Sequence, residues 1–240
     1  MKDVDALLYM IHFLFATRSS GVSLRRSDKC QADLLLTLRA FADCSHNCHG
    51  NGKSHYGFCF DLVDSNTMGP LGPEGPQYDP NFYGEEGPRL DTGMFFSKSV
   101  MASTVDLQSC EGEIGTTVES TKDVILMRGV LNELHQFQVR ATPLFGDNDS
   151  TIKLGSSYNG NHKRVRYMLP KINWLMEQTQ AGVIQLYRMG TDKLPPDTLT
   201  KISSGTEWQN KLISLQGSRL GAHVITFFVG NVVYMAFKTL

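Results

Sequence analysis

Four acidic side chains stand at the ends of regular segments in this sequence, and they are the residues best suited to chemistry: Asp43, Glu113, Asp147 and Asp197. Two of them follow apolar, strand-like segments, and the other two fall in the first turns of expected helices. Taken singly, an aspartate after a strand is usually a turn residue, and an acid in a first helical turn usually complements the helix dipole. Crowded together, however, carboxylates raise one another's pKa unless cations neutralise them.

Carboxylates that meet at one point can bind metal ions for phosphate chemistry. Two divalent ions about 3.5–4 Å apart form a clamp for in-line attack at phosphorus. Mg²⁺ suits a set of oxygen ligands because it prefers hard donors and retains water molecules for the reaction. We therefore expect two Mg²⁺ ions, with Mn²⁺ as a substitute, if these four acids converge.

The pattern of apolar segments indicates how the acids are positioned. Segments 34–41 and 57–63 are rich in strand formers and flank a turn of Gly, His and Asn, which predicts a hairpin whose first strand ends at Asp43. Further on, the pattern predicts a strand resuming at 94–96, a helix at 109–135, a strand at 139–144, helices at 148–156 and 166–180, a strand at 183–188 and a helix at 197–215. This order indicates a mixed α/β fold with a central sheet covered by helices.

Composition and charge limit the classes of function. The chain has 240 residues, 23 Lys and Arg against 24 Asp and Glu, and a net charge of −1, which excludes wholesale polycationic binding of nucleic acid but leaves room for a local basic patch. A hydrophobic share of 41% predicts a folded chain. Its 5 cysteines are an odd number and too few for a disulfide scaffold, so we expect a reducing, intracellular compartment.

Three segments lie outside the pattern of the sheet. Residues 4–15 are apolar but too short to span a bilayer, and we expect a buried helix there. Residues 64–93 contain 5 of the 9 prolines, which predicts an inserted irregular loop. Residues 221–240 form an apolar tail interrupted by Gly230-Asn231, for which a packed strand pair or an appendage remains open and a membrane span is not expected.

Five short motifs occur in order along residues 37–214. They are Ala42–His46 with Gly52–Gly57, Ser109–Ile114, Phe145–Ile152, His162–Tyr167 and Asp197–Lys201. Together they resemble the ribonuclease H (RNase H) domain of copia-type (Pseudoviridae-like) retrotransposon polyproteins. Residues 1–30 also resemble the helix and strand that connect the polymerase to this domain in that family.

The resemblance implies an RNase H-like fold with a mixed five-stranded sheet, three antiparallel strands followed by parallel ones, flanked by helices. It implies that Asp43, Glu113, Asp147 and Asp197 are catalytic metal ligands, and that the substrate is the RNA strand of an RNA–DNA hybrid. Phosphate contacts would come from Lys163, Arg164 and Arg166. The implied domains are 1–30, 37–214 with its insertion at 64–93, and a tail at 215–240. The implied partner is the reverse transcriptase portion of the same polyprotein, in the cytoplasm or nucleus and away from membranes.

Departures from the family pattern support a second hypothesis. Tyr167 stands where the family often has His, Pro195-Pro196 precede Asp197, and Asp149 stands where Gln is usual beside Asp147. A catalytically inactive or co-opted RNase H-like remnant that still binds nucleic acid is therefore the alternative function.

Two other groups of residues indicate different chemistry. Five potential zinc ligands fall close together in the sequence: Cys44, His46, Cys48, His49 and His55. Their spacing matches no common zinc finger, so a zinc-dependent nucleic-acid-binding protein is a third hypothesis. Asp91-Thr92-Gly93 matches the triplet of retroviral-type aspartic proteases, but the preceding Arg89 favours a glycine turn leading into a strand.

Overall fold

The structure is a computed structural model, and it describes residues 36–64, 93–156, 166–201, 215, 224–229 and 232–237. The expectations for residues 4–15, for the loop within 64–93, for the Asp91 triplet and for Lys163 and Arg164 lie outside the described residues.

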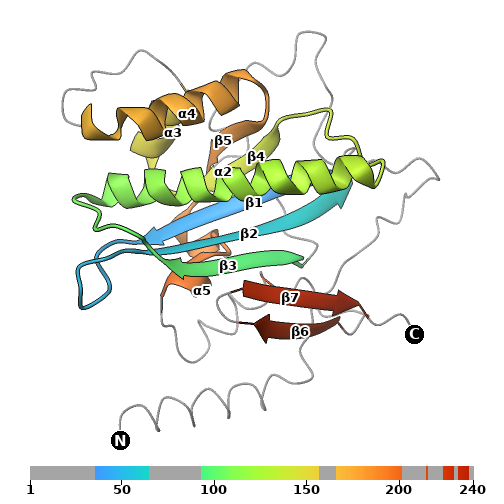
Figure 1. Cartoon of the computed structure of the whole chain (residues 1–240), viewed down its shortest axis with the longest axis horizontal. Helices are drawn as coiled ribbons and strands as arrows, with labels where there is room; N and C mark the ends of the chain where they lie inside the picture. The colour runs from blue at the N-terminus through green and yellow to red at the C-terminus, as the bar shows by residue number, and fades with distance from the viewer. Residues whose placement is uncertain are drawn as a thin grey trace, which may run out of the picture.

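A central sheet organises the fold (Figure 1). Its strands are β1 (Leu36–Ser45), β2 (His55–Asp64), β3 (Phe96–Met101), β4 (Thr142–Gly146), β5 (Ile184–Arg188), β6 (Val224–Val229) and β7 (Val232–Phe237), in the spatial order β5-β4-β1-β2-β3-β7-β6. The strands β1, β2 and β3 are antiparallel neighbours, whereas β4 runs parallel to β1 and β5 parallel to β4. Strands β1 to β5 thus form a mixed five-stranded arrangement, three antiparallel strands followed by parallel ones, which is the arrangement that the family resemblance implies.

The tail adds a hairpin to this sheet. Strands β6 and β7 pair antiparallel along their whole length, and β7 joins the edge of β3 through the pairs Ser97↔Val233 and Lys98↔Val232. Of the alternatives that the sequence leaves open for the tail, the structure contains the strand pair.

Helices cover both faces of the sheet. On one face lie α2 (Ser109–Glu133), α3 (Asp149–Ser156) and α4 (Leu169–Gln180), and the other face carries the single helical turn α5 (Asp197–Thr200), which follows a short 3₁₀ turn at Thr191–Lys193. Because side chains alternate across a strand, Leu38, Ala40 and Ala42 of β1 pack beneath the first group of helices, whereas Phe41 joins the second core with Leu199. Among the described residues no helix is long and apolar enough to cross a membrane.

The buried face of α2 differs from the one that helical periodicity predicts for residues 109–135, which has Ile114, Val118 and Ile125 on one side and Leu131 and Leu134 near the end. Ile114, Val118 and Leu131 are buried as the periodicity indicates, but Ile125 is 41% exposed and Val124 is buried in its place. The buried line drifts around the helix toward its C-terminal end, which is the course that a long helix follows when it crosses a twisted sheet. Leu134, predicted near the end of this face, is also exposed and occupies the C-cap position of the helix.

Several predicted boundaries are wrong by a few residues or more. The strand predicted at 139–144 begins at Thr142, and Val139 before it is exposed. The strand predicted to resume at Met94 begins at Phe96. The helix predicted over 197–215 is interrupted after Thr200, because Lys201 has extended backbone angles of φ −125° and ψ 143°, and residues 202–214 lie outside the described residues.

Candidate metal centre

Three of the four predicted acids converge. Each of Asp43, Glu113 and Asp147 offers a carboxylate oxygen that lies within 4.8 Å of the other two. They come from β1, from the first turns of α2 and from the residue after β4, so the three segments meet at one end of the sheet. Within the described residues this is the one group of three potential ligands close enough to share an ion.

Asp43 is held in place by α5, which lies on the face of the sheet opposite α2. Its side chain is buried, and its carboxylate accepts a hydrogen bond from the hydroxyl of Thr200 in α5. In the β1–β2 ladder Asp43 stands opposite Gly57. A Cβ atom on Gly57 would lie 2.6 Å from Cγ2 of Thr200 and 3.0 Å from the carbonyl oxygen of Pro196. The absence of a side chain at position 57 therefore lets α5 approach the sheet beside Asp43.

Glu113 reaches the site because α2 packs closely on β1 and β2. A Cβ atom on Gly112 would lie 2.6 Å from Sγ of Cys44, and one on Gly115 would lie 2.3 Å from Oη of Tyr56. Tyr56 is fixed in turn, since its hydroxyl donates to the carboxylate of Asp106 at 3.1 Å. These two glycines flank Glu113 and allow its backbone to come near the end of β1.

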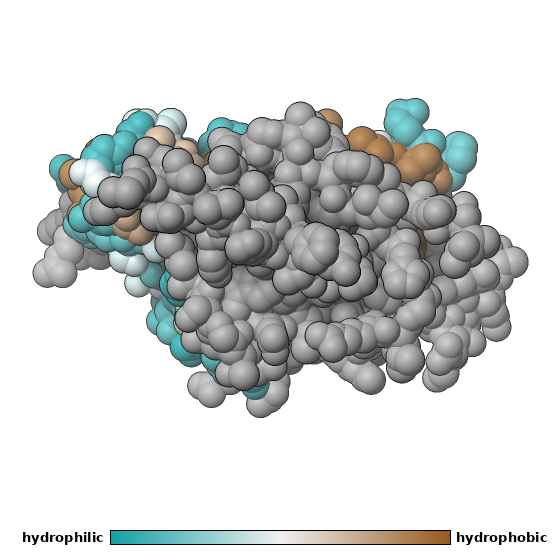
Figure 2. Space-filling view, turned by 90° about the horizontal axis from the view of Figure 1, so that it is seen from below, coloured by the Kyte–Doolittle hydropathy of each residue, from teal (hydrophilic) through white to brown (hydrophobic). Residues whose placement is uncertain are grey.

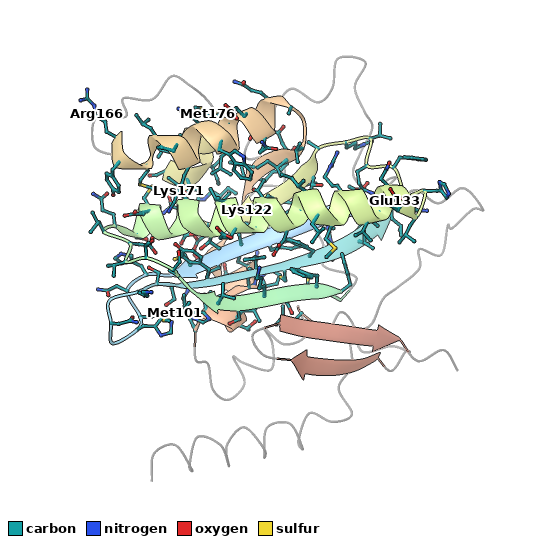
Figure 3. All side chains as sticks on the ribbon, in the orientation of Figure 1. Met101, Lys122, Glu133, Arg166, Lys171 and Met176 are labelled. Atoms are coloured by element: carbon teal, nitrogen blue, oxygen red, sulfur yellow. The ribbon has the colours of Figure 1, made fainter. Side chains whose placement is uncertain are left out.

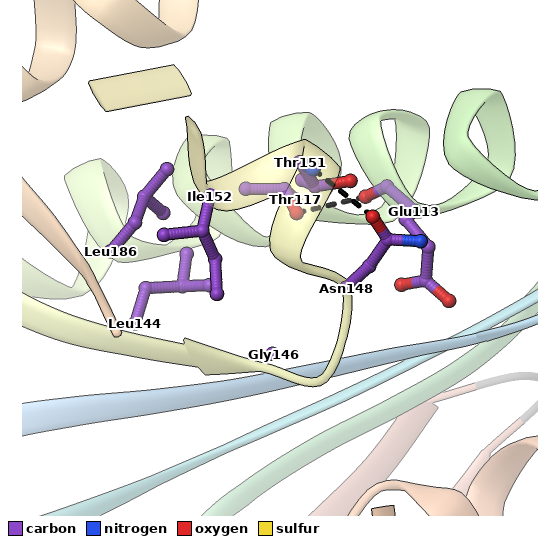
Figure 4. Close-up of a pocket in the computed structure, with 8 residues that line it drawn as sticks. All are labelled: Glu113, Thr117, Leu144, Gly146, Asn148, Thr151, Ile152 and Leu186. Atoms are coloured by element: carbon purple, nitrogen blue, oxygen red, sulfur yellow. Dashed lines mark hydrogen bonds between the residues drawn. The ribbon is translucent and has the colours of Figure 1, made fainter. Parts of the chain in front are cut away.

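Asp147 is positioned by the turn that ends β4. Its Oδ2 accepts a hydrogen bond from Oγ1 of Thr191 at 2.7 Å. The next residue, Asn148, accepts a hydrogen bond from the backbone N–H of Thr151 at 3.1 Å and so caps the start of α3 (Figure 4). Figure 4 also shows Asn148 and Glu113 side by side at one end of a small pocket whose other end is lined by Leu144, Ile152 and Leu186.

Asp197, the fourth predicted acid, begins α5 and is 1% exposed. It does not belong to the group of three, although its charge acts on Asp43. Its Oδ1 instead binds the ammonium group of Lys201. Sequence reasoning gave no role to Lys201 or Thr200, but the signal was present. Residues three and four positions after Asp197 lie on its side of a helical turn.

Burial and mutual repulsion make the carboxylates hard to ionise. Burial is the main cause that raises the pKa of Glu113 to about 9, and the charges of Asp147 and Asp43 add to it. Burial also raises the pKa of Asp43, against the opposing effects of the Thr200 hydrogen bond and the charge of Lys201. A cation between these groups would favour their ionised forms.

The donor set fits a hard divalent cation. Three carboxylates from rigid elements supply oxygen ligands, and neither histidine nor cysteine belongs to the group. Mg²⁺ and Mn²⁺ accept such ligands, whereas zinc sites in proteins usually include nitrogen or sulfur.

The described residues do not assemble the zinc site of the third hypothesis. Nε2 of His49 lies 2.9 Å from Nδ1 of His55, and Nε2 of His46 lies 3.1 Å from the carbonyl oxygen of Asp106. Cys44 is buried and Cys48 is exposed, and neither joins a group of three ligands. The clustering of these residues in the sequence reflects the turn between β1 and β2.

Of the three predicted phosphate contacts, Arg166 alone is described. It is exposed and lies just before α4. Figure 3 shows Arg166 at the end of the molecule where β3 ends at Met101, and Glu133 at the opposite end. Because Glu133 is the last residue of α2, Arg166 lies at the same end of the molecule as the start of α2 and the carboxylates.

Comparisons with known proteins give structural likenesses alone. No family model and no curated protein matches the chain. Among solved structures it is similar to LC11-RNase H1, an enzyme isolated from compost by a metagenomic approach, with 10% identity, a TM-score of 0.40, and coverage of 68% of this chain and 91% of that one. It is also similar to the protease-reverse transcriptase of prototype foamy virus, with 10% identity, a TM-score of 0.34, and coverage of 83% of this chain and 23% of that one.

Proposed function

We propose that this protein is a metal-dependent endonuclease of the RNase H type, which hydrolyses the RNA strand of RNA–DNA hybrids and derives from a copia-type retrotransposon. The observation that carries the proposal is the convergence of Asp43, Glu113 and Asp147 on an RNase H-like sheet. Buried carboxylates that repel one another are costly for a fold to maintain, and a metal-binding role accounts for them.

Each residue of the centre has a distinct task in this proposal. Asp43, Glu113, Asp147 and Asp197 would hold the divalent ions, which supply activation of the attacking water and stabilisation of the leaving 3′ oxygen. Thr200 and Thr191 orient the carboxylates of Asp43 and Asp147 through their hydroxyl groups. Such outer hydrogen bonds fix the ligands before an ion arrives.

The substrate would lie across the end of the sheet where the carboxylates meet. Arg166 stands at that end and is free to contact phosphates, with Lys163 and Arg164 preceding it in the sequence. Contacts with 2′-hydroxyl groups would select RNA over DNA. In the view from below, Figure 2 shows mainly hydrophilic surface on the described part of this end, and both hydrophobic and hydrophilic surface on the described part of the opposite end.

The proposed setting follows from the family resemblance. The reverse transcriptase portion of the same polyprotein would supply the hybrid, and the work would take place in the cytoplasm or nucleus. The departures from the family pattern at Tyr167, Pro195-Pro196 and Asp149 keep the inactive, nucleic-acid-binding remnant as the second candidate.

The decisive experiment is cleavage of a labelled RNA–DNA hybrid with Mg²⁺ or Mn²⁺. We expect cleavage by the unmodified protein and a loss of at least about 100-fold in Asp147→Asn, because even residues that only support metal ligands commonly cost 10–100-fold. The matched control is Asp123→Asn. Asp123 lies on α2, and its carboxylate is 3.1 Å from the ammonium group of Lys98 on β3, so this variant should cleave the hybrid normally.

The outcomes separate the two candidates. Absence of cleavage with either metal by a folded protein that still binds the hybrid would support the inactive remnant. Equal cleavage by Asp147→Asn and the unmodified protein would refute the proposed centre.

A further inference from the structure

We propose that Lys201 is a built-in cation of the carboxylate centre, which takes the place of one of the two expected divalent ions beside Asp197. The centre would then bind one divalent ion strongly, through Asp43, Glu113 and Asp147. This inference rests on the proposed function and changes it at one point, because Asp197 then binds the ammonium group of Lys201 in place of a second divalent ion.

Contacts of α5 place Lys201 at the centre. Its ammonium group binds Oδ1 of Asp197, a side chain that is only 2% exposed. The preceding residue, Thr200, donates its hydroxyl to Asp43. The chain segment that carries Lys201 is therefore fixed to two of the four predicted ligands.

The charge of Lys201 reaches beyond its own helical turn. A Lys four residues after an Asp could simply be a surface ion pair that stabilises a helix. Here, however, the positive charge also acts on Asp43 and on Glu113, which come from two other elements. The ammonium of Lys201 thus offsets part of the repulsion among acids that are distant in the sequence.

Asp197 and Lys201 explain why the fourth acid stands apart from the group of three. An aspartate whose oxygen is bound by an ammonium group is a weaker metal ligand, because a second cation must displace the first. Asp43, Glu113 and Asp147 each offer a carboxylate oxygen within 4.8 Å of the other two, which is close enough to share one ion.

The test measures metal binding without reference to cleavage. Mn²⁺ is titrated into the full chain, with free Mn²⁺ followed by electron paramagnetic resonance and heat by calorimetry. We expect one strongly bound Mn²⁺ in the unmodified protein and a second in Lys201→Gln, with at least tenfold tighter binding of that second ion. Lys201→Arg keeps the charge and should bind one.

Controls separate this inference from the proposed function. Lys122→Gln removes an exposed lysine paired with Glu119 at 2.7 Å on α2 and should bind Mn²⁺ as the unmodified protein does. Strong binding in the unmodified protein that is lost in Asp147→Asn, together with unchanged or weaker binding in Lys201→Gln, would overturn the role of Lys201 alone.

Two further results complete the design. Absence of Mn²⁺ binding in every variant would overturn the proposed centre itself. If Lys201→Gln fails to fold, Lys201→Arg still decides, because binding of two ions by a protein that keeps the positive charge contradicts the inference.

Discussion

Glu113 is the residue whose ionisation should dominate the behaviour of the metal-free protein. Its folded-state pKa of about 9 lies above the ordinary value of 4.5, so between these values the unfolded chain releases a proton that the folded protein retains. Stability must therefore fall as pH rises through this window, and below about pH 4.5 the effect disappears.

We expect Glu113→Gln to be more stable than the unmodified protein at pH 8 without metal, by about 1 kcal/mol or more. For a chain of this size that corresponds to roughly 2–4 °C in the unfolding temperature. Thermal unfolding by circular dichroism at pH 5 and pH 8 would measure it. Glu133→Gln, at the exposed far end of the same helix, is the matched control (Figure 3). An equal pH dependence in Glu113→Gln and the unmodified protein would contradict the raised pKa.

At the scale of the element, the close packing of α2 on β2 decides where Glu113 lies. A side chain at Gly115 would collide with Tyr56, whereas Gly129 on the same helix has nothing within 4 Å of its would-be Cβ. We expect Gly115→Ala to destabilise the fold by about 1–3 kcal/mol, because the helix must move away from the sheet. The same shift should weaken Mn²⁺ binding.

Gly129→Ala provides the opposite result on the same helix. It should stabilise the protein by roughly 0.5–1 kcal/mol, because alanine loses less backbone freedom than glycine in a helix. Urea unfolding of both variants measures the two effects. If Gly115→Ala were as stable as Gly129→Ala, the contact with Tyr56 would not limit the position of α2.

At the scale of the whole molecule, an ion in the centre would join elements that are far apart in the sequence. Asp43, Glu113 and Asp147 belong to β1, α2 and the end of β4, so an ion bound by all three should stabilise the fold as a unit. A ligand at about 100 times its dissociation constant adds roughly 2.7 kcal/mol. We expect Mg²⁺ to raise the unfolding temperature at pH 8, and EDTA to reverse the rise. Asp147→Asn should show no such rise. An equal rise in that variant would place the ion elsewhere.

The sequence predicts the sheet well where short apolar segments carry the information. The segments around β1, β2 and β5 consist of strand formers bounded by turn residues, and their strands form close to the predicted places. Prediction fails where the answer depends on distant packing. Ile125 fits the helical period of Ile114, yet it is exposed because the twist of the sheet, which periodicity does not contain, moves the buried line.

The candidate centre, like the sheet, can be predicted from the sequence only in part. The positions of the acids at the ends of segments predict that they meet, and the structure brings three of them within reach of one ion. The role of Gly57 could not be predicted with equal ease, because it depends on how α5 lies against β2, a contact between residues more than a hundred positions apart. The pairing of Asp197 with Lys201 is local, and the spacing of four residues was the signal for it.

The attachment of β7 to β3 has a consequence for how the protein behaves at high concentration. An unpaired strand edge presents backbone N–H and C=O groups that another chain can adopt as a template. Because Val232 and Val233 occupy that edge of β3, the strand nearest the hairpin is shielded from association with neighbouring copies. In the strand order β6 is outermost, so the edge at which another chain could extend this side of the sheet is β6 and not β3.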